Sequence, residues 1–206
     1  MTAYWRTCVE AAAVAAAAAT APAGLAAQAS DLPPAGFGSL RQDQVAVTIT
    51  TNNLAVRVLP LDEHVIRLLA PDSYASLHAL VQSRSTAITA AARTAGRDSV
   101  AAFFVTFFGL QPQVTFMPDQ VSIQSQGVFY RPLGIVPFSP QWNDARVDQR
   151  QQASAIYLFD PAIPMSQTFT VFYGDQNSAT FDNSLTLLQS ERARVLARAA
   201  QQASPQ

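Results

Sequence analysis

Alternating apolar and polar residues mark the first two strands of the chain. Residues 45–51 read VAVTITT, with a branched apolar side chain at every second position, and residues 54–60 (LAVRVLP) repeat the alternation. A period of two is typical of a strand with one buried face. Asparagine tolerates positive φ, so Asn52-Asn53 favours a tight hairpin between the two strands.

The period becomes helical between residues 61 and 95. LDEHVIRLLA and then YASLHALVQSRSTAITAAARTA space their apolar residues by three and four. The side chains that share one face of the second segment are Tyr74, Leu77, Val81 and Ile88. Asp72 or Ser73 is the predicted N-cap and Gly96 the predicted stop. We therefore expect a helical insertion over 61–95, between strands.

Strand patterns then return. The predicted strands are 100–110, 121–124, 128–130, 153–159 and 168–173. Both alternating sets of VAAFFVTFFGL (100–110) are apolar, which predicts a central strand covered on both faces. Ser125-Gln126-Gly127 supplies a turn. About seven strands joined by sequential hairpins favour an antiparallel β-sandwich.

A C-terminal helix and an N-terminal leader complete the predicted organisation. The helix begins at Asp182 or Ser184 and has Leu185, Leu188 and Val195 on one side, where they should dock on the sheets or on a partner. Residues 1–29 have the order of a secretory signal peptide, with an early arginine, an alanine-rich middle and small residues before Ser30. The predicted parts are a signal peptide (1–29), a flexible linker (30–43), a single β-sandwich domain with its helical insertion (44–200) and a disordered tail (201–206).

The amino-acid composition excludes several kinds of catalytic and binding chemistry. The only cysteine is Cys8, inside the predicted leader, and all 13 basic residues are arginine. The exported chain would therefore have no disulfide, no thiol nucleophile and no Schiff-base or P-loop lysine. The net charge of −1, with no basic stripe before the C-terminal helix, argues against nucleic acid as a partner. Once the leader is removed, we expect no stable transmembrane helix.

Residues 100–175 carry a family resemblance in the order of their motifs. An aromatic strand (AFFVTFF) precedes SQGVFYRP, the loop SPQW, AIYLFDP and FTVFYGD. This order resembles the immunoglobulin-like accessory domains of secreted or surface-anchored bacterial proteins. The resemblance implies a mainly β, immunoglobulin-like sandwich, here interrupted by the helices of 61–95, and a binding or scaffolding role.

Both histidines fall in the helical insertion. His64 and His78 could meet from two helices, and Asp62 or Glu63 could join them at a metal. The spacing matches no standard metal motif, and a catalytic zinc needs three protein ligands. The alternative is that Asp62 and Glu63 occupy the first turn of a helix, where acidic side chains oppose the dipole. We predict no metal and no cofactor.

Other catalytic candidates depend on loop residues. Ser139 stands between two prolines without a nucleophile-elbow motif, and Gly36-Phe37-Gly38 lacks the third glycine of a dinucleotide fingerprint. Asp144 and Asp148 flank Arg146 near a tryptophan, a pair that could serve glycoside hydrolysis. The intervening arginine favours a solvated, charge-balanced surface instead.

The aromatic residues between 129 and 142 are the best binding candidates. Phe129, Tyr130, Phe138 and Trp142 lie close in sequence, and Arg131 could stack on one of them. Such a platform binds sugars or extended peptides, with Tyr130, Arg131 and Trp142 as the ligand contacts. Buried aromatics between two sheets are the other interpretation, and we favour core packing.

The sequence thus predicts a noncatalytic interaction or structural module of the bacterial cell envelope, exported to the periplasm or beyond. Its partner would be an envelope protein or a surface polymer. A carbohydrate- or peptide-binding module is the alternative function. A hydrolase drawing on Asp144, Asp148 or the histidines is the third.

Overall fold

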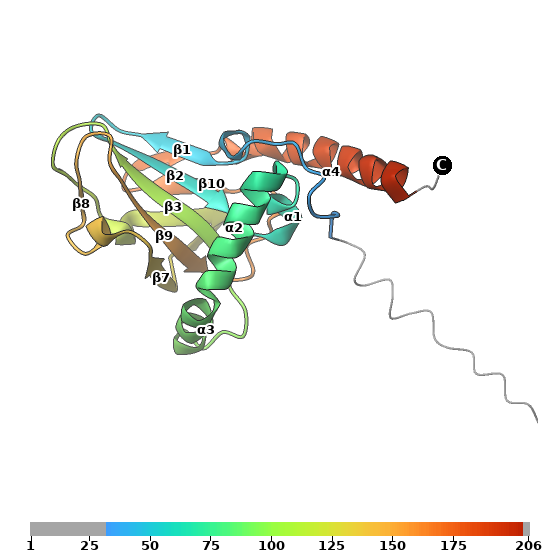
Figure 1. The fold of residues 1–206 in the computed structure, drawn as a ribbon. Coiled ribbons are helices and arrows are strands. Elements are labelled where there is room, and N and C mark those ends of the chain that lie inside the picture. Colours follow the sequence, from blue (N-terminus) through green and yellow to red (C-terminus); the bar gives the residue numbers. More distant parts are fainter. Residues whose placement is uncertain (1–31, 204–206) are drawn as a thin grey trace, which may run out of the picture. The chain divides into compact units, whose positions relative to one another are not determined.

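The computed structural model describes residues 32–203, so the predicted leader (1–29) and the last three residues lie outside the described residues. The described chain is a mixed α/β fold with antiparallel sheets and a long C-terminal helix (Figure 1). The strands are β1 (Val47–Thr50), β2 (Leu54–Pro60), β3 (Ala101–Gly109), β4 (Val114–Thr115), β5 (Val121–Ser125), β6 (Val128–Tyr130), β7 (Gly134–Pro137), β8 (Arg146–Val147), β9 (Gln152–Phe159), β10 (Thr170–Tyr173) and β11 (Gln176–Ser178). The α-helices are α1 (Glu63–Ile66), α2 (Pro71–Ser83), α3 (Ser85–Thr94) and α4 (Phe181–Ala203), and the 3-10 helices are η1 (Gln42–Gln44), η2 (Pro118–Gln120) and η3 (Pro140–Trp142).

Five strands form the larger sheet, in the order β1-β2-β3-β9-β7 with antiparallel neighbours. The predicted hairpin at Asn52-Asn53 and the central position of β3 are confirmed, but the predicted cover on both faces of β3 is incomplete, since Phe108 is 37% exposed. The register pairs Val58 with Val105 and Val105 with Ala155, all fully buried. Since side chains alternate along a strand, this register gathers the branched and aromatic residues of four strands on one face.

The smaller sheet has four strands in the order β11-β10-β5-β6. The β5–β6 turn that the sequence predicts is present, and Gln126 and Gly127 both have positive φ, 52° and 79°. A two-residue hairpin turn of this hand matches the twist of the strands it joins. β4 and β8 form a separate two-stranded ladder.

Aromatic rings connect the two larger sheets into one core. Phe103 of β3 meets Phe169, the residue before β10, with ring centroids 5.7 Å apart. Phe107 of β3 meets Tyr173 of β10, also at 5.7 Å. Edge-to-face and tilted pairs of this kind contribute roughly 0.5–1.5 kcal/mol each beyond the area they bury.

Helices α2 and α3 occupy the predicted insertion, and α3 packs against β7 and β9. The predicted N-cap of the second helix is two to three residues late: α2 begins at Pro71, with Ala70 in the cap position and no side-chain cap bond. Proline suits the first helical position because its φ is already helical and its missing N–H would be unpaired there. The predicted stop is confirmed, since α3 ends just before Gly96, whose φ is +68°.

The segment predicted as a flexible linker, 30–43, differs in the structure: its described part, from residue 32, is packed. Leu40 is buried and forms a β-bridge with Leu69. The backbone at Gly38 lies so close to Leu68 that a Cβ there would stand 2.3 Å from the Leu68 carbonyl carbon. Gly38, which was predicted to lie in a flexible linker, therefore permits a close approach of two backbone segments.

Helix α4 begins at Phe181, one residue before the first of the two predicted starts and three before the second, and continues through Ala203, so the predicted disordered tail is helical over its first three residues. Phe181 stacks on Phe169, with centroids 4.1 Å apart. Leu188 and Val195 are buried, as predicted for the apolar side of this helix, and Ser184 and Glu191 hold the helix to Gln44 and Ser39. None of the helices between residues 32 and 203 combines the length and apolar character of a membrane span.

Candidate functional site

Trp142 lies in the core rather than on a binding surface. It is 9% exposed, and its ring contacts Phe107, Phe116 and Tyr157 at centroid distances of 5.7, 5.2 and 6.0 Å. The short η3 helix positions it, because Pro140 begins that helix and the Trp142 amide donates to the Ser139 carbonyl. The favoured core interpretation therefore agrees with the burial of this tryptophan.

Tyr130 and Arg131 do not share a site with Trp142. Tyr130 is half-buried at the end of β6, in the four-stranded sheet, and Arg131 is exposed just beyond it. Trp142 lies beside β9 of the other sheet. In the part of the chain that the structure describes, no ring contact joins Tyr130 to Trp142, so these three residues do not make one platform.

A different pair of aromatic side chains reaches solvent on the four-stranded sheet. Phe129 of β6 is 59% exposed, and its ring centroid lies 5.1 Å from that of Phe172 on β10, with the planes tilted by 56°. The strands β6 and β10 are not neighbours, since β5 lies between them. The two rings therefore meet above β5, on the side of the sheet that faces away from the core.

The register shows what surrounds this pair. Phe172 lies opposite Ser122 and Asn177, and Gln124 lies opposite Phe129 and Thr170. The intervening residues Val121, Ile123 and Val171 are fully buried, so these six side chains point outward. The exposed Arg131, directly after β6, continues the register opposite Ser122 on the same side. We call this surface the aromatic face; its members are Ser122, Gln124, Phe129, Thr170, Phe172 and Asn177.

Sequence reasoning included Phe129 among the aromatic candidates but missed Phe172. The strand TFTVFY was predicted, but it has aromatic side chains on both faces, so its pattern does not show which face is buried. Asn177 belongs to β11, which was not predicted. The register with β5 supplies the missing information, because it places Phe172 opposite the outward-facing Ser122.

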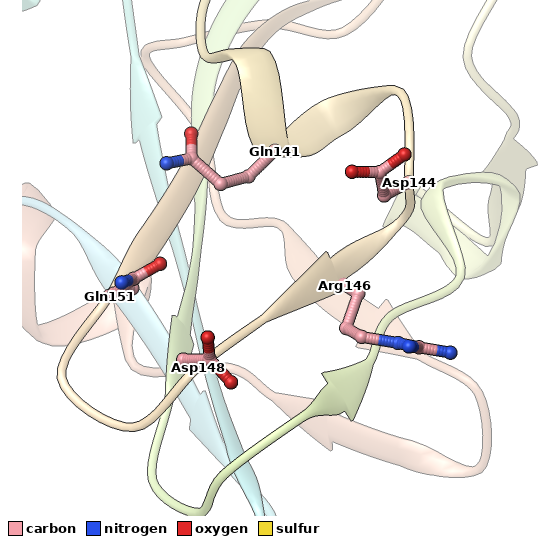
Figure 2. Close-up of a pocket in the computed structure, with 5 residues that line it drawn as sticks. All are labelled: Gln141, Asp144, Arg146, Asp148 and Gln151. Atoms are coloured by element: carbon pink, nitrogen blue, oxygen red, sulfur yellow. The ribbon is translucent and has the colours of Figure 1, made fainter.

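The second surface is a polar cavity of about 420 Å³ around β8 (Figure 2). Its lining residues are Gln141, Asp144, Arg146, Asp148 and Gln151. The structure thus brings Asp144 and Asp148 to one cavity, as the glycosidase hypothesis requires. Both carboxylates are exposed, however, and Asp148 accepts a hydrogen bond of 3.0 Å from the Gln113 amide. A general acid needs a desolvated carboxyl, which these surroundings do not provide.

Asp62 and Glu63 occupy the N-cap and the first turn of α1, as the alternative to a metal site predicted, and each of them pairs with a different histidine. Asp62 caps α1, accepting from the His64 amide at 2.8 Å, and its carboxylate also lies 3.0 Å from His64 Nδ1. His78 Nδ1 on α2 lies 2.8 Å from Glu63 Oε1, and Arg67 donates to the other Glu63 oxygen. The contact between His78 and Glu63 fastens α1 to α2.

The Glu63 carboxylate is fixed in its charged form. Burial favours the neutral acid, but the hydrogen bonds from Arg67 and His78 outweigh it and hold the pKa of Glu63 below its usual value. Within residues 32–203, no group of three or more His, Cys, Asp and Glu side chains could hold a metal ion.

Beside these pairs lies an apolar cavity, also of about 420 Å³. It is lined mainly by aliphatic side chains from the insertion, the start of β3 and the 161–165 loop, with Asp62, Glu63 and His64 at its polar end. Ser139, a nucleophile candidate from the sequence that lacks an elbow motif, is not among its lining residues. The Ser139 hydroxyl instead accepts a hydrogen bond of 2.9 Å from the Ser154 amide, which ties η3 to β9.

Comparison with known proteins adds no relative: no protein-family model, no curated protein and no solved structure matches the chain. The aromatic face is the candidate site that the geometry supports best.

Proposed function

We propose that the chain is a noncatalytic interaction or structural module of the bacterial cell envelope, and that it acts through the aromatic face. In this proposal the two larger sheets form an immunoglobulin-like β-sandwich that carries the helical insertion. The ring contacts of Phe103 and Phe107 across the sheets support that architecture. The order of residues in 1–29 supports export.

One observation carries the proposal: a large aromatic side chain, Phe129, is 59% exposed and paired with Phe172 on a sheet face turned away from the core. Burying a phenylalanine on folding is worth roughly 1.5–3 kcal/mol, and this pair forgoes much of that stabilisation. A contiguous exposed apolar patch rimmed by polar residues is typical of an interaction surface.

The noncatalytic part of the proposal is supported by the present roles of the reactive side chains. Glu63 and His78 bind each other across α1 and α2, and the Ser139 hydroxyl accepts from the backbone of β9. Asp144 and Asp148 are exposed around an open polar cavity. Each of these groups has a structural or solvated role that needs no substrate.

Co-sedimentation of the purified protein with isolated envelopes of the bacterium that expresses it tests the proposal. The informative variant is Phe129→Ala. Its matched control is Phe108→Ala, because Phe108 of β3 is also a partly exposed phenylalanine, at 37%, but belongs to the other sheet.

We expect the wild type and Phe108→Ala to sediment alike and Phe129→Ala to bind about tenfold more weakly, the effect of losing one aromatic contact at an interface. Equal binding by all three proteins would contradict the proposal. Mass spectrometry of the exported protein tests the leader, with a mature start at Ser30 as the expected result.

A further inference from the structure

We infer that the apolar cavity beside α1 binds a small cationic amphiphile, an aliphatic chain of on the order of ten carbons with an ammonium head group. The residues that line this cavity are different from those of the aromatic face, so the inference goes beyond the proposed function. Three observations carry it: the aliphatic lining, the volume and the charge at each end of the cavity.

The lining is aliphatic and comes from several parts of the described chain. Val81 belongs to α2, Ile88 to α3 and Ala101 to β3, and Met165 lies in the loop after β9. These four side chains are only half-buried, so the cavity is open to a ligand rather than sealed in the core. Its lining within residues 32–203 holds no aromatic ring. A flat aromatic ligand would therefore find no ring to stack on, whereas an alkyl chain gains dispersion contacts along the whole wall.

The volume indicates the size of the occupant. The cavity measures about 420 Å³, whereas an apolar cavity of roughly 150 Å³ already holds a benzene molecule. A methylene group needs about as much room as a water molecule, roughly 30 Å³, so a chain of on the order of ten carbons fits. A single side chain of a partner protein would leave most of this space empty. The volume therefore favours a whole small molecule.

The end of the cavity at α1 carries a negative charge that no arginine balances. Glu63 is paired with both Arg67 and His78. Asp62 is paired with His64, which unlike an arginine is charged only when protonated, and within residues 32–203 Asp62 has no other ion pair. The Asp62 side chain is 37% exposed, so a cation in the cavity can reach it. An ammonium head group complements this end of the cavity.

Charge at the other end disfavours an anionic head group. A second cavity, of about 330 Å³, shares Ile88 with the first and has Arg93 and Arg97 in its lining. Arg97 is held by Asp160 at 2.7 Å, and Asp98 lines the same cavity as Arg93. Two carboxylates thus balance the two arginines, and no net positive charge remains for a fatty acid or a phosphate.

NMR of protein labelled at the methionine methyl groups tests the inference, because the described chain has one methionine in the cavity and one elsewhere. Met165 lines the cavity, and Met117 is exposed just before η2. The probes share an eight-carbon chain and differ in the head group: n-octylammonium, 1-octanol and octanoate. The informative variant is Asp62→Asn, because asparagine is also a good N-cap residue. Its control is Asp72→Asn, at an exposed position in the first turn of α2.

We expect octylammonium to shift the Met165 methyl signal saturably and to leave the Met117 signal unchanged. At low salt it should bind about fivefold more tightly than octanol, the effect of one partly exposed ion pair. Asp62→Asn should remove this preference for the amine, and Asp72→Asn should retain it. Emission from the buried Trp142 verifies that each variant is folded.

The inference is overturned if none of the three probes shifts the Met165 signal, if octanol or octanoate binds as tightly as octylammonium, or if Asp62→Asn keeps the preference. Octanoate binding that is lost in Arg93→Ala would also overturn it, by assigning an anionic ligand to the two adjoining cavities. None of these outcomes bears on the proposed function, because envelope sedimentation that depends on Phe129 involves a different surface.

Discussion

Replacing Glu191 should reveal how the N-terminal segment is held on α4. This carboxylate is fully buried, and its Oε1 accepts from the Ser39 amide at 2.9 Å, from the Ser39 hydroxyl at 2.8 Å and from Arg198. Its Oε2 has no hydrogen-bond partner and lies 3.6 Å from Arg194 Nη1. One side chain thus joins α4 to a segment 152 residues away in sequence.

The size of the effect follows from these contacts. Glu191→Ala removes the acceptor of two Ser39 donors and one arginine. Because the side chains of Arg198 and Arg194 are 37% and 66% exposed, the loss comes mainly from the unpaired Ser39 donors, at about 1–3 kcal/mol each. In a domain of this length that loss lowers the thermal midpoint by on the order of 10 °C. Glu191→Gln keeps an acceptor for Ser39 but loses the charge, which should cost about 1–3 kcal/mol.

The effect also has a defined dependence on pH. Burial opposes ionisation of Glu191, but the bonds from Ser39 and Arg198 outweigh it and keep the pKa of the carboxyl below its usual value. Its contribution to stability is therefore complete above the pKa of an unfolded glutamate and is lost as the pH falls through the lower, folded-state pKa.

Urea unfolding of wild type, Glu191→Ala, Glu191→Gln and the control Gln189→Ala, an exposed position on the same helix, measures these costs. We expect the advantage of wild type over Glu191→Gln to be present at neutral pH and to shrink in acid. If Glu191→Ala were as stable as the control, or if its cost did not change with pH, the reasoning would be refuted.

Three further outcomes are expected from the fold. Trp142→Ala should lower the free energy of unfolding in urea by about 3–5 kcal/mol, because it empties a buried site among three rings. The emission of wild-type Trp142 should be blue-shifted and protected from acrylamide. A red-shifted, readily quenched tryptophan would contradict the core assignment. Gly38→Ala should shift the thermal midpoint down strongly, since its Cβ would stand 2.3 Å from the Leu68 backbone, and an unchanged midpoint would show that the segment is not packed as described. Asp62→Ala should lower the free energy of unfolding by about 1 kcal/mol, because it removes the cap that accepts from the His64 backbone amide. A loss well above this would mean that the carboxylate has a larger role than capping.

The strongly periodic elements of this fold follow from the sequence, because each has a pattern long enough to define its buried face. The strands β2, β3 and β9 and the helices of the insertion are of this kind. The strands that the sequence did not predict, β4, β7, β8 and β11, have two to four residues. Their pairing is supplied by neighbours distant in sequence, as when β7 adds to the edge of β9.

The candidate site was only partly predictable for the same reason. The aromatic cluster near residue 130 was identified, but its tryptophan is buried by Phe107 and Phe116. The partner of Phe129 is Phe172, and only the register of β5 with β6 and β10 brings the two rings to one face. Similarly, Ser39 was predicted as part of a flexible segment because nothing local indicates its bonds to Glu191.

The central claim, that the aromatic face is the interaction surface, is tested most directly by hydrogen–deuterium exchange of the protein alone and bound to isolated envelopes. We expect binding to slow exchange in β5, β6, β10 and β11 and to leave exchange in the 141–151 segment around the polar cavity unchanged. Protection confined to that segment or to α2 and α3, with none in the four-stranded sheet, would contradict the claim.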